Sequence, residues 1–249
     1  MLNLYEEAQD KVRASSYNQQ VNIFTGLQSP KVIYETDSKY NGHIQVVEFG
    51  DIRRIMVDGF AQSVSHHANH VQRLYWGKVI QILKENFTQL HNVLLLGLGG
   101  GTLVHMISKT FPGVYITSVD IDQTMVDIAN NYFDLGSVPN HRIIVDDALR
   151  LVIEPSKFGI SEFEFSAVIV DIYIGEKYPD LGKSGNFIAA VKNLVAPGGL
   201  IIFNRIYRES HQDEVNTFID YVSGFFSNVK NLVVAGHTNS DNVLIYAKV

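Results

Sequence analysis

Residues 93–102 read VLLLGLGGGT, and this stretch decides the fold of the chain. A short apolar run leads into a glycine turn, and a helical pattern begins at Thr102, which is typical of a buried parallel strand followed by a helix. Gly97, Gly99 and Gly101 let the backbone turn tightly and bring bare N–H groups against a ligand. The stretch therefore predicts a ligand-binding turn at the carboxyl end of a parallel strand.

An acid ends the next predicted strand. Residues 118–122 read SVDID, and Asp120 stands 23 residues beyond Gly97. An acid in this position commonly holds the hydroxyls of a ribose. The two stretches together predict that a nucleoside-bearing cofactor lies across the carboxyl edge of a parallel sheet.

The composition excludes several classes of function. The chain has 249 residues, of which 46% are hydrophobic and 18% charged, so it can bury a substantial core. A net charge of −6 provides no basic field for nucleic acid, and the absence of cysteine excludes disulfides, thiolate metal sites and a cysteine nucleophile. No signal-peptide pattern opens the chain, and no apolar run approaches membrane-spanning length. We therefore expect a cytoplasmic protein that binds neither nucleic acid nor a membrane.

Three regions are expected along the chain. Residues 1–20 are polar and form an N-terminal arm, whereas residues 21–63 have the period-two pattern of a small antiparallel β-domain. Residues 64–249 form the larger, cofactor-binding domain. The strands expected in the small domain are at residues 31–35, 43–48 and 53–57.

The larger domain is predicted to alternate strands and helices. One amphipathic helix is expected from His66 to Phe87. The strands that follow are centred on residues 92–96, 115–119, 142–146, 167–171 and 199–203. Residues 230–235 and 242–248 have no room for a helix between them, so they form an antiparallel hairpin at a sheet edge. We therefore predict an α/β fold with a seven-stranded, doubly wound, Rossmann-like sheet.

Three features favour S-adenosylmethionine over a dinucleotide as the cofactor. The turn is G-x-G-x-G, with Thr102 where a dinucleotide fingerprint has its third glycine. A further acidic strand end at Asp146 and Asp147 suits an adenine amino group. The terminal hairpin is the usual end of folds that use S-adenosylmethionine.

The chain resembles the spermidine synthase family and its methyltransferase-like relatives from about Val32 to the C-terminus. Residues 57–62, VDGFAQ, are similar to the family's L-D-G-x-x-Q, whose glutamine contacts the cofactor. The resemblance implies this role for Gln62 and identifies Gly97–Gly101 with the cofactor loop.

The same resemblance implies roles for three acids. Asp120 matches the acid that holds the ribose hydroxyls, and Asp147 matches the acid that faces adenine. Asp171 stands at the position of the family's catalytic aspartate, where it serves either as a general base or as a positioning group. Tyr173 either stacks on the substrate or covers the edge of its pocket.

The chain departs from true spermidine synthases at specific positions. Gly100 replaces an aspartate of the loop, and Ile174 replaces a second acid near the catalytic one. The glutamate and tyrosine that line the family's amine channel fall near Ser65 and Val71. A buried diamine needs carboxylates at both ends, because the desolvation of its charges is otherwise uncompensated.

These departures favour intact S-adenosylmethionine as the donor. Its carboxylate would accept N–H bonds from a glycine-only loop, whereas an aspartate would repel it. We expect methyl transfer to a small-molecule acceptor. Aminopropyl transfer from decarboxylated S-adenosylmethionine to a polyamine and non-catalytic binding of S-adenosylmethionine remain open alternatives.

Two further expectations concern metal binding and assembly. His66 and His70 should share a helix face, but no third ligand is evident, so no metal site is expected. Tyr75 and Trp76 are expected in the core or at a subunit contact. The exposed edges of the small antiparallel sheet favour a homodimer or homotetramer.

Overall fold

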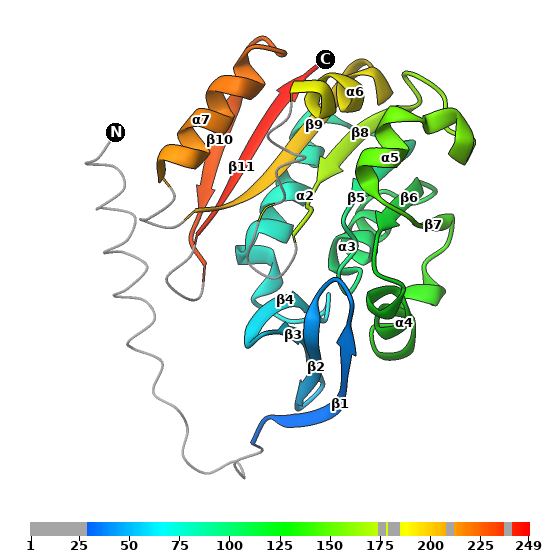
Figure 1. Ribbon diagram of the computed structural model, residues 1–249, viewed down its shortest axis with the longest axis vertical. Coiled ribbons are helices and arrows are strands. Elements are labelled where there is room, and N and C mark those ends of the chain that lie inside the picture. Colours follow the sequence, from blue (N-terminus) through cyan, green and yellow to red (C-terminus); the bar gives the residue numbers. More distant parts are fainter. Residues whose placement is uncertain (1–28, 174–177, 179–184, 208–211, 237–240) are drawn as a thin grey trace.

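The computed structural model describes residues 29–173, 178, 185–207, 212–236 and 241–249. The arm expected at residues 1–20 lies outside this part of the chain. Two β-sheets and the helices that cover them make up an α/β fold, with the smaller sheet beneath the larger one in Figure 1. Of the helices described, none has both the length and the apolar composition needed to cross a membrane.

The larger sheet has seven strands in the order β10-β11-β9-β8-β5-β6-β7. Their bounds are β5 Asn92–Leu96, β6 Tyr115–Asp120, β7 His141–Val145, β8 Phe165–Val170, β9 Val195–Tyr207, β10 Lys230–Val234 and β11 Asp241–Lys248. β5 to β9 are parallel to one another, and β11 is antiparallel to both β9 and β10. The predicted doubly wound sheet with a terminal antiparallel hairpin is confirmed.

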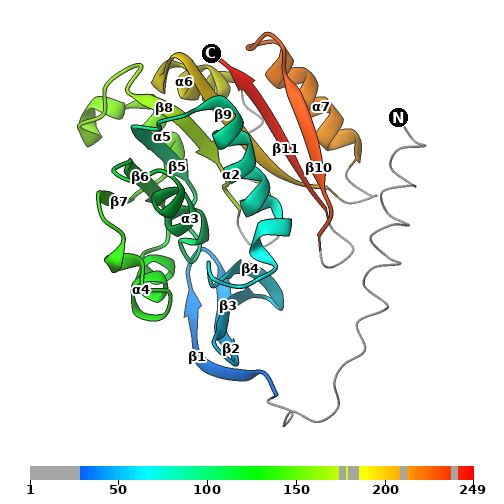
Figure 2. The ribbon, with the colours of Figure 1, turned by 180° about the vertical axis from the view of Figure 1, so that it is seen from behind.

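Helices cover both faces of this sheet, as Figures 1 and 2 show from opposite sides. One face packs on α2 (Tyr75–Asn86), α3 (Thr102–Thr110) and α4 (Gln123–Tyr132). The other packs on α5 (Ala148–Ile153), α6 (Gly185–Leu194) and α7 (Gln212–Ser223). Three short 3-10 helices are η1 (Val71–Arg73), η2 (Leu135–Ser137) and η3 (Pro155–Phe158). Successive residues of a strand face opposite sides of the sheet. A strand buried on both faces, such as β5, therefore needs a continuous apolar run, which residues 93–96 provide.

The smaller sheet has four antiparallel strands rather than the three expected. They are β1 (Lys31–Ser38), β2 (Gly42–Phe49), β3 (Ile52–Val57) and β4 (Phe60–Val64). Asp58 and Gly59, with φ angles of 48° and 84°, form the two-residue hairpin turn that joins β3 to β4. The same residues belong to the D-G-x-x-Q motif, so the motif ends in a strand.

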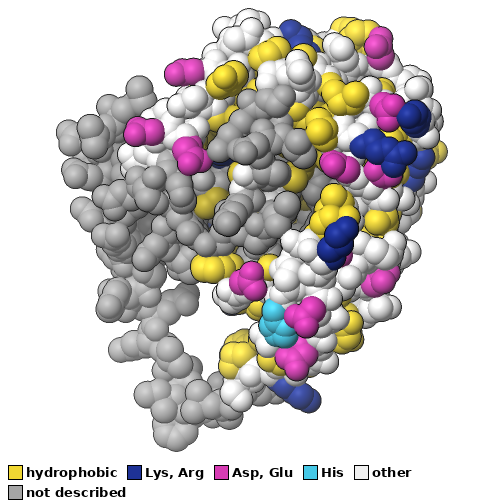
Figure 3. Space-filling model, viewed as in Figure 1, with side chains coloured by type: hydrophobic (Ala, Val, Ile, Leu, Met, Phe, Trp, Pro, Cys, Tyr) yellow, Lys and Arg dark blue, Asp and Glu magenta, His cyan; other side chains and the backbone are white. Residues whose placement is uncertain are grey.

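Apolar side chains of the smaller sheet pack against α4 of the larger unit. Ile44, Val46, Ile55 and Val57 form a buried cluster with Met125, Ile128 and Phe133. Polar contacts add to it, because Ser38 and Asn41 both donate to the carboxylate of Asp122 at the start of α4. On the face shown in Figure 3, lysine and arginine side chains stand among acidic ones rather than in one basic patch.

The single helix predicted from His66 to Phe87 is wrong. The helix α2 begins at Tyr75, after η1 and an extended Leu74 with φ −86° and ψ 177°. A Cβ added at Gly77 would lie 2.2 Å from the carbonyl oxygen of Gln72, so η1 packs against the first turn of α2. His66 and His70 therefore do not share a helix face.

Gly77→Ala tests this packing. An alanine inside a helix ordinarily stabilises by up to about 1 kcal/mol. Here the collision with the Gln72 backbone should instead lower the free energy of unfolding by about 1–3 kcal/mol, measured by urea denaturation. The control is Gly136→Ala, whose added Cβ meets nothing closer than 3.7 Å and should change stability by less than about 0.5 kcal/mol. Equal stabilities of the two variants would contradict the described packing.

Candidate functional site

The carboxyl edge of the larger sheet brings the predicted site residues together. The chain passes from β5 outward to β6 and β7 and then returns to β8 on the other side of β5. Ligands in open α/β sheets bind outside the carboxyl ends of the strands at such a reversal. Gly97 follows β5 and Asp171 follows β8, and the N–H of Asp171 donates to the carbonyl of Leu96 at 2.8 Å. We therefore place the candidate site between these two strand ends.

Close packing requires two glycines of the loop. Gly97 has a φ of 95°, and a Cβ added there would lie 2.1 Å from the carbonyl oxygen of Asp171. Gly101 has a φ of 77°, and its Cβ would lie 2.5 Å from Cδ1 of Leu135. Because Gly97 has no side chain, the loop backbone packs directly against the backbone of Asp171 at the end of β8.

A serine from the smaller sheet closes the loop. The N–H of Gly100 donates to Oγ of Ser63 at 2.7 Å. A Cβ on Gly100 would lie 2.9 Å from Cβ of Ser63 and 3.1 Å from Cδ1 of Ile55, so the space that an aspartate would need is filled. Gln62 also lies beside the loop, because its carbonyl oxygen would be 3.9 Å from a Cβ on Gly99.

The prediction that Gly97, Gly99 and Gly101 present bare N–H groups is wrong. The N–H of Gly97 donates to the carbonyl of Val119 at 2.8 Å, that of Gly101 donates to the carbonyl of Leu98 at 3.1 Å, and that of Gly99 bonds Asp120. The carboxylate of Asp120 accepts the N–H of Leu98 at 3.0 Å and that of Asp122 at 2.9 Å. Burial raises the pKa of Asp120, and the backbone N–H groups of Asp122, Leu98 and Gly99 oppose the rise. The strand-end acid thus holds the shape of the loop that it adjoins.

Asp146 and Asp147 lie along the same edge as Asp120. The N–H of Asp146 donates to the carbonyl of Asp120 at 3.1 Å, and its carboxylate pairs with Arg150 at 2.8 Å. Oδ1 of Asp147 accepts the N–H of Leu149 at 2.8 Å and caps α5. Both acids therefore have structural contacts in addition to any role toward a ligand.

Two side chains from different elements hold Asp171. Its Oδ2 accepts from the hydroxyl of Tyr75 at 3.0 Å, and its Oδ1 accepts from Nδ2 of Asn204 at 2.8 Å. The Asn204 amide is fixed in turn, because Nδ2 of Asn242 donates to its Oδ1 at 3.0 Å. Burial raises the pKa of Asp171, and the bonds from Asn204 and Tyr75 oppose the rise. The result is a carboxylate of fixed orientation at the carboxyl edge.

Sequence reasoning missed the roles of Tyr75 and Asn204. The ring of Tyr75 packs against the core as expected, but its hydroxyl reaches Asp171, and burial raises its pKa well above 10.0. Helices of a doubly wound sheet run antiparallel to the strands, so their first turns lie at the carboxyl edge. Had the helix been predicted to begin at residue 75 rather than 66, Tyr75 would have been expected in its first turn, at the carboxyl edge. Asn204 offered a signal too, as a polar residue directly after the apolar run of β9.

The other positions suggested by the resemblance serve the fold. The hydroxyl of Tyr173 donates to the backbone carbonyl of Asn204 at 2.8 Å. Oγ of Ser65 accepts a backbone N–H from β3 at 2.9 Å, and Val71 is buried in the core. Ile174 lies outside the described residues.

The histidines near the loop form a neutral contact. His66 stacks on His105 with ring centroids 4.1 Å apart, and the Nε2 of His105 lies 2.8 Å from the carbonyl oxygen of Phe133. Burial, with smaller effects from His105 and His67, lowers the pKa of His66 to about 4. Among the described residues, no three histidine, aspartate or glutamate side chains gather as metal ligands would.

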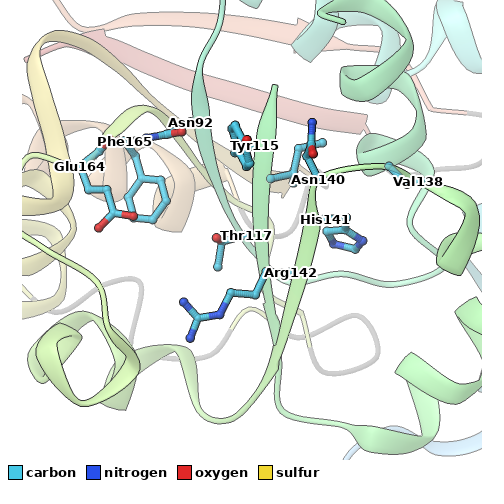
Figure 4. Close-up of a pocket in the computed structure, with 10 residues that line it drawn as sticks. Asn92, Tyr115, Thr117, Val138, Asn140, His141, Arg142, Glu164 and Phe165 are labelled. Carbon is cyan, nitrogen blue, oxygen red and sulfur yellow. Dashed lines mark hydrogen bonds between the residues drawn. The ribbon is translucent and has the colours of Figure 1, made fainter. Parts of the chain in front are cut away.

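A hollow of about 430 Å³ lies at the opposite, amino edge of the sheet (Figure 4). Its lining includes Asn92, Tyr115, His141 and Phe165, the first residues of β5, β6, β7 and β8. Arg142 borders it and donates to the carbonyl of Phe158 at 2.6 Å. Since the predicted site residues are at the carboxyl edge, this hollow is not the candidate site.

Comparison with known sequences agrees with this geometry. The family model described as "Spermine/spermidine synthase domain" matches residues 55–249. A probable polyamine aminopropyl transferase of Bifidobacterium longum is 26% identical over 221 residues, which cover 86% of this chain and 46% of that protein. An eEF1A lysine and N-terminal methyltransferase homolog of Drosophila pseudoobscura is 29% identical over 124 residues, 47% of this chain and 18% of that protein. The chain thus spans less than half the length of these curated relatives.

Solved structures share the fold. A probable spermidine synthase from Corynebacterium glutamicum superposes with a TM-score of 0.71 at 17% identity, covering 88% of this chain and 81% of that one. Human methyltransferase-like protein 13 in complex with S-adenosylhomocysteine superposes with a TM-score of 0.55 at 20% identity, covering 71% of this chain and 81% of that one. The family model covers well over half of the chain, and the chain therefore belongs to the spermine/spermidine synthase family.

Proposed function

We propose that the protein is a transferase that takes a methyl group from S-adenosylmethionine and passes it to a small acceptor. The observation that carries this proposal is the closure of the glycine loop by Ser63. A Cβ at position 100 would lie 2.9 Å from Cβ of Ser63, so an acid there would require the smaller sheet to shift. A loop without an acid does not repel the carboxylate of intact S-adenosylmethionine, which the decarboxylated donor lacks.

The residues at the carboxyl edge suit such a donor. We assign the ribose hydroxyls to Asp120 and the adenine edge to Asp147, with Gln62, Gly97, Gly99 and Gly101 beside the rest of the molecule. A glycine loop lets a ligand approach the backbone closely, as the close contact of Gly97 with Asp171 illustrates within the protein itself. The bound donor would supply an activated carbon on a positively charged sulfur.

Asp171 is assigned to the acceptor. Its carboxylate is fixed by Tyr75 and Asn204, so it can orient the acceptor nucleophile or take its proton. Burial raises the pKa of Asp171, which makes it a stronger base than an exposed aspartate. The remaining contribution of the protein is to align donor and acceptor and to exclude water.

Aminopropyl transfer is the second candidate, and two relatives support it. The relative from Bifidobacterium longum that matches 86% of this chain is named a probable polyamine aminopropyl transferase, and a second relative is the polyamine aminopropyltransferase of Vibrio vulnificus. The Asp171 carboxylate could also orient an amine. The two candidates differ in the donor that they require.

Calorimetric titration separates the candidates. S-adenosylmethionine and S-adenosylhomocysteine should bind more tightly than decarboxylated S-adenosylmethionine. The decarboxylated donor keeps only its amine at this end, and the loop has no acid at position 100 to bind that amine. If the decarboxylated donor binds about ten times more tightly, a difference of about 1.4 kcal/mol, aminopropyl transfer replaces methyl transfer as the proposal.

Asp120→Asn tests the ribose assignment. The variant should lose about 1.5–3 kcal/mol of affinity for S-adenosylhomocysteine, the range for hydrogen bonds to a charged group. Asp146→Asn is the matched control, because Asp146 is a neighbouring acid paired with Arg150, and its affinity should stay within a few-fold. Unchanged affinity in Asp120→Asn would remove this residue from the site.

Asp171→Asn and Tyr75→Phe test the acceptor side, once a screen of amines, carboxylic acids and phenols has given a turnover assay. Asp171→Asn should slow turnover by about 10²–10⁴-fold. Tyr75→Phe removes a donor that favours the charged carboxylate, so the pKa of Asp171 rises and the acidic limb of the rate profile moves to higher pH. Tyr173→Phe, whose hydroxyl bonds a backbone carbonyl instead, should leave that limb in place.

The screen also decides whether the protein is an enzyme. Tight binding of S-adenosylmethionine without turnover of any acceptor would favour a non-catalytic binding protein. A pH profile that moves equally in Tyr75→Phe and Tyr173→Phe would contradict the role of Tyr75.

A further inference from the structure

A buried arginine beside the candidate site lacks hydrogen-bond partners. Arg205 belongs to β9 and is 3% exposed. It lies two residues beyond Phe203, which pairs with Val170 at the end of β8, so it stands at the carboxyl edge of the sheet. Its Nε and Nη1 atoms are buried without a partner, as is the hydroxyl of Tyr178. Within the described part of the chain, these are the three buried side-chain polar atoms that lack one.

Aromatic rings cover the guanidinium without satisfying it. Its central carbon lies 3.6 Å from the ring centroid of Tyr178 and 4.7 Å from that of Phe218 on α7. Such contacts stabilise a cation through the faces of the rings. They accept no hydrogen bond from Nε or Nη1, and arginine cannot discard its charge by losing a proton. A buried charge in proteins is ordinarily paired or fully hydrogen-bonded.

Asp171, the acid of the candidate site, does not accept a hydrogen bond from Arg205. The two carboxylate oxygens of Asp171 already accept from Asn204 and Tyr75. The hydroxyl of Tyr173 donates to a backbone carbonyl. None of the ion pairs formed between described residues includes Arg205. Nε and Nη1 of Arg205 therefore have no hydrogen-bond acceptor among the described residues.

Contacts connect Arg205 to the acid assigned to the acceptor, although the Arg205 side chain lies on the α7 face of β9 and the Asn204 side chain on the α2 face. The ring of Tyr178 is 5.7 Å from that of Tyr173, whose hydroxyl bonds the backbone of Asn204, and the Asn204 amide bonds Asp171. We propose that Arg205 and Tyr178 bind an anionic oxygen group of the acceptor, which is a carboxylate or a phosphate. This proposal rests on the proposed transferase function. The acceptor is then an anion or zwitterion, whose reacting atom is directed to Asp171.

A binding role for Arg205 disfavours a polyamine as the acceptor. A diamine would bring a second positive charge beside a guanidinium that already lacks a partner, and like charges in a water-poor site repel strongly. An anionic group would instead accept the hydrogen bonds that Nε, Nη1 and the Tyr178 hydroxyl can donate. The charge of the acceptor is therefore the property that Arg205 selects.

Titrations of the full-length protein loaded with S-adenosylhomocysteine test the proposal. The probes are acetate, succinate and inorganic phosphate, with putrescine as the cationic comparison, at constant ionic strength. At least one anion should bind saturably, and putrescine should not. Arg205→Leu should weaken that binding by about 10- to 100-fold, the factor for lost hydrogen bonds to a charged group. Arg205→Lys should retain part of it, because the charge remains.

Two further variants make the result specific. Tyr178→Phe should weaken anion binding by a few-fold, because it keeps the ring beneath the guanidinium and removes the hydroxyl. Arg142→Leu removes the same charge at the opposite edge of the sheet, beside the hollow of Figure 4, and should leave binding unchanged. Stronger binding of phosphate than of both carboxylates would identify a phosphorylated acceptor, and the reverse order a carboxylic acid.

The proposal would be overturned if none of the anions bound saturably, if wild type and Arg205→Leu bound an anion equally, or if putrescine bound saturably. Loss of binding in Arg142→Leu alone would place the anion at the amino edge and would also overturn it. The loading step is measured separately. If S-adenosylhomocysteine does not bind, the donor assignment fails, whereas the same titrations on the unloaded protein still decide the role of Arg205.

Discussion

The contact between the backbone of Gly97 and that of Asp171 is the constraint on which the site depends. Neighbouring parallel strands bring the two segments together, since Leu96 and Val170 are paired in register and Gly97 and Asp171 follow them. With an added Cβ only 2.1 Å from the Asp171 carbonyl oxygen, nothing larger than hydrogen fits between them. The glycine loop and Asp171 are thus parts of one packed unit, and the distance between them is set by the sheet rather than by flexible side chains.

The smaller sheet belongs functionally to this unit. Its last strand provides Ser63, which bonds Gly100, and the carbonyl of Val64, which accepts the hydroxyl of Thr102 at 2.7 Å. Its inner face packs on α4 through an apolar cluster. Residues of the smaller sheet occupy the space that a side chain at position 100 would need. An acid at position 100 would displace Ser63 and Ile55 from their present positions.

The sequence predicts strands better than it predicts contacts between distant residues. Apolar runs bounded by glycine and acids located the parallel strands and the acids at their ends, because burial on both faces permits few other patterns. The helix start at Tyr75 was missed because the apolar spacing of residues 66–74 imitates a helix, whereas the packing of Gly77 against Gln72 breaks it. Arg205 carries no signal in the sequence, since its burial depends on Tyr178 and Phe218, which approach it only in the folded chain.

The bond from Asn242 to Asn204 links the terminal hairpin of the sheet to Asp171. Strand β11 lies between β9 and β10, and its Asn242 fixes which end of the Asn204 amide faces Asp171. Without this bond the amide could rotate and turn its oxygen toward the carboxylate, which would repel it. With β11 detached from the sheet, Tyr75 alone would thus hold the Asp171 carboxylate in a defined orientation. The orientation of this carboxylate is therefore a property of three neighbouring strands, β8, β9 and β11, rather than of one strand end.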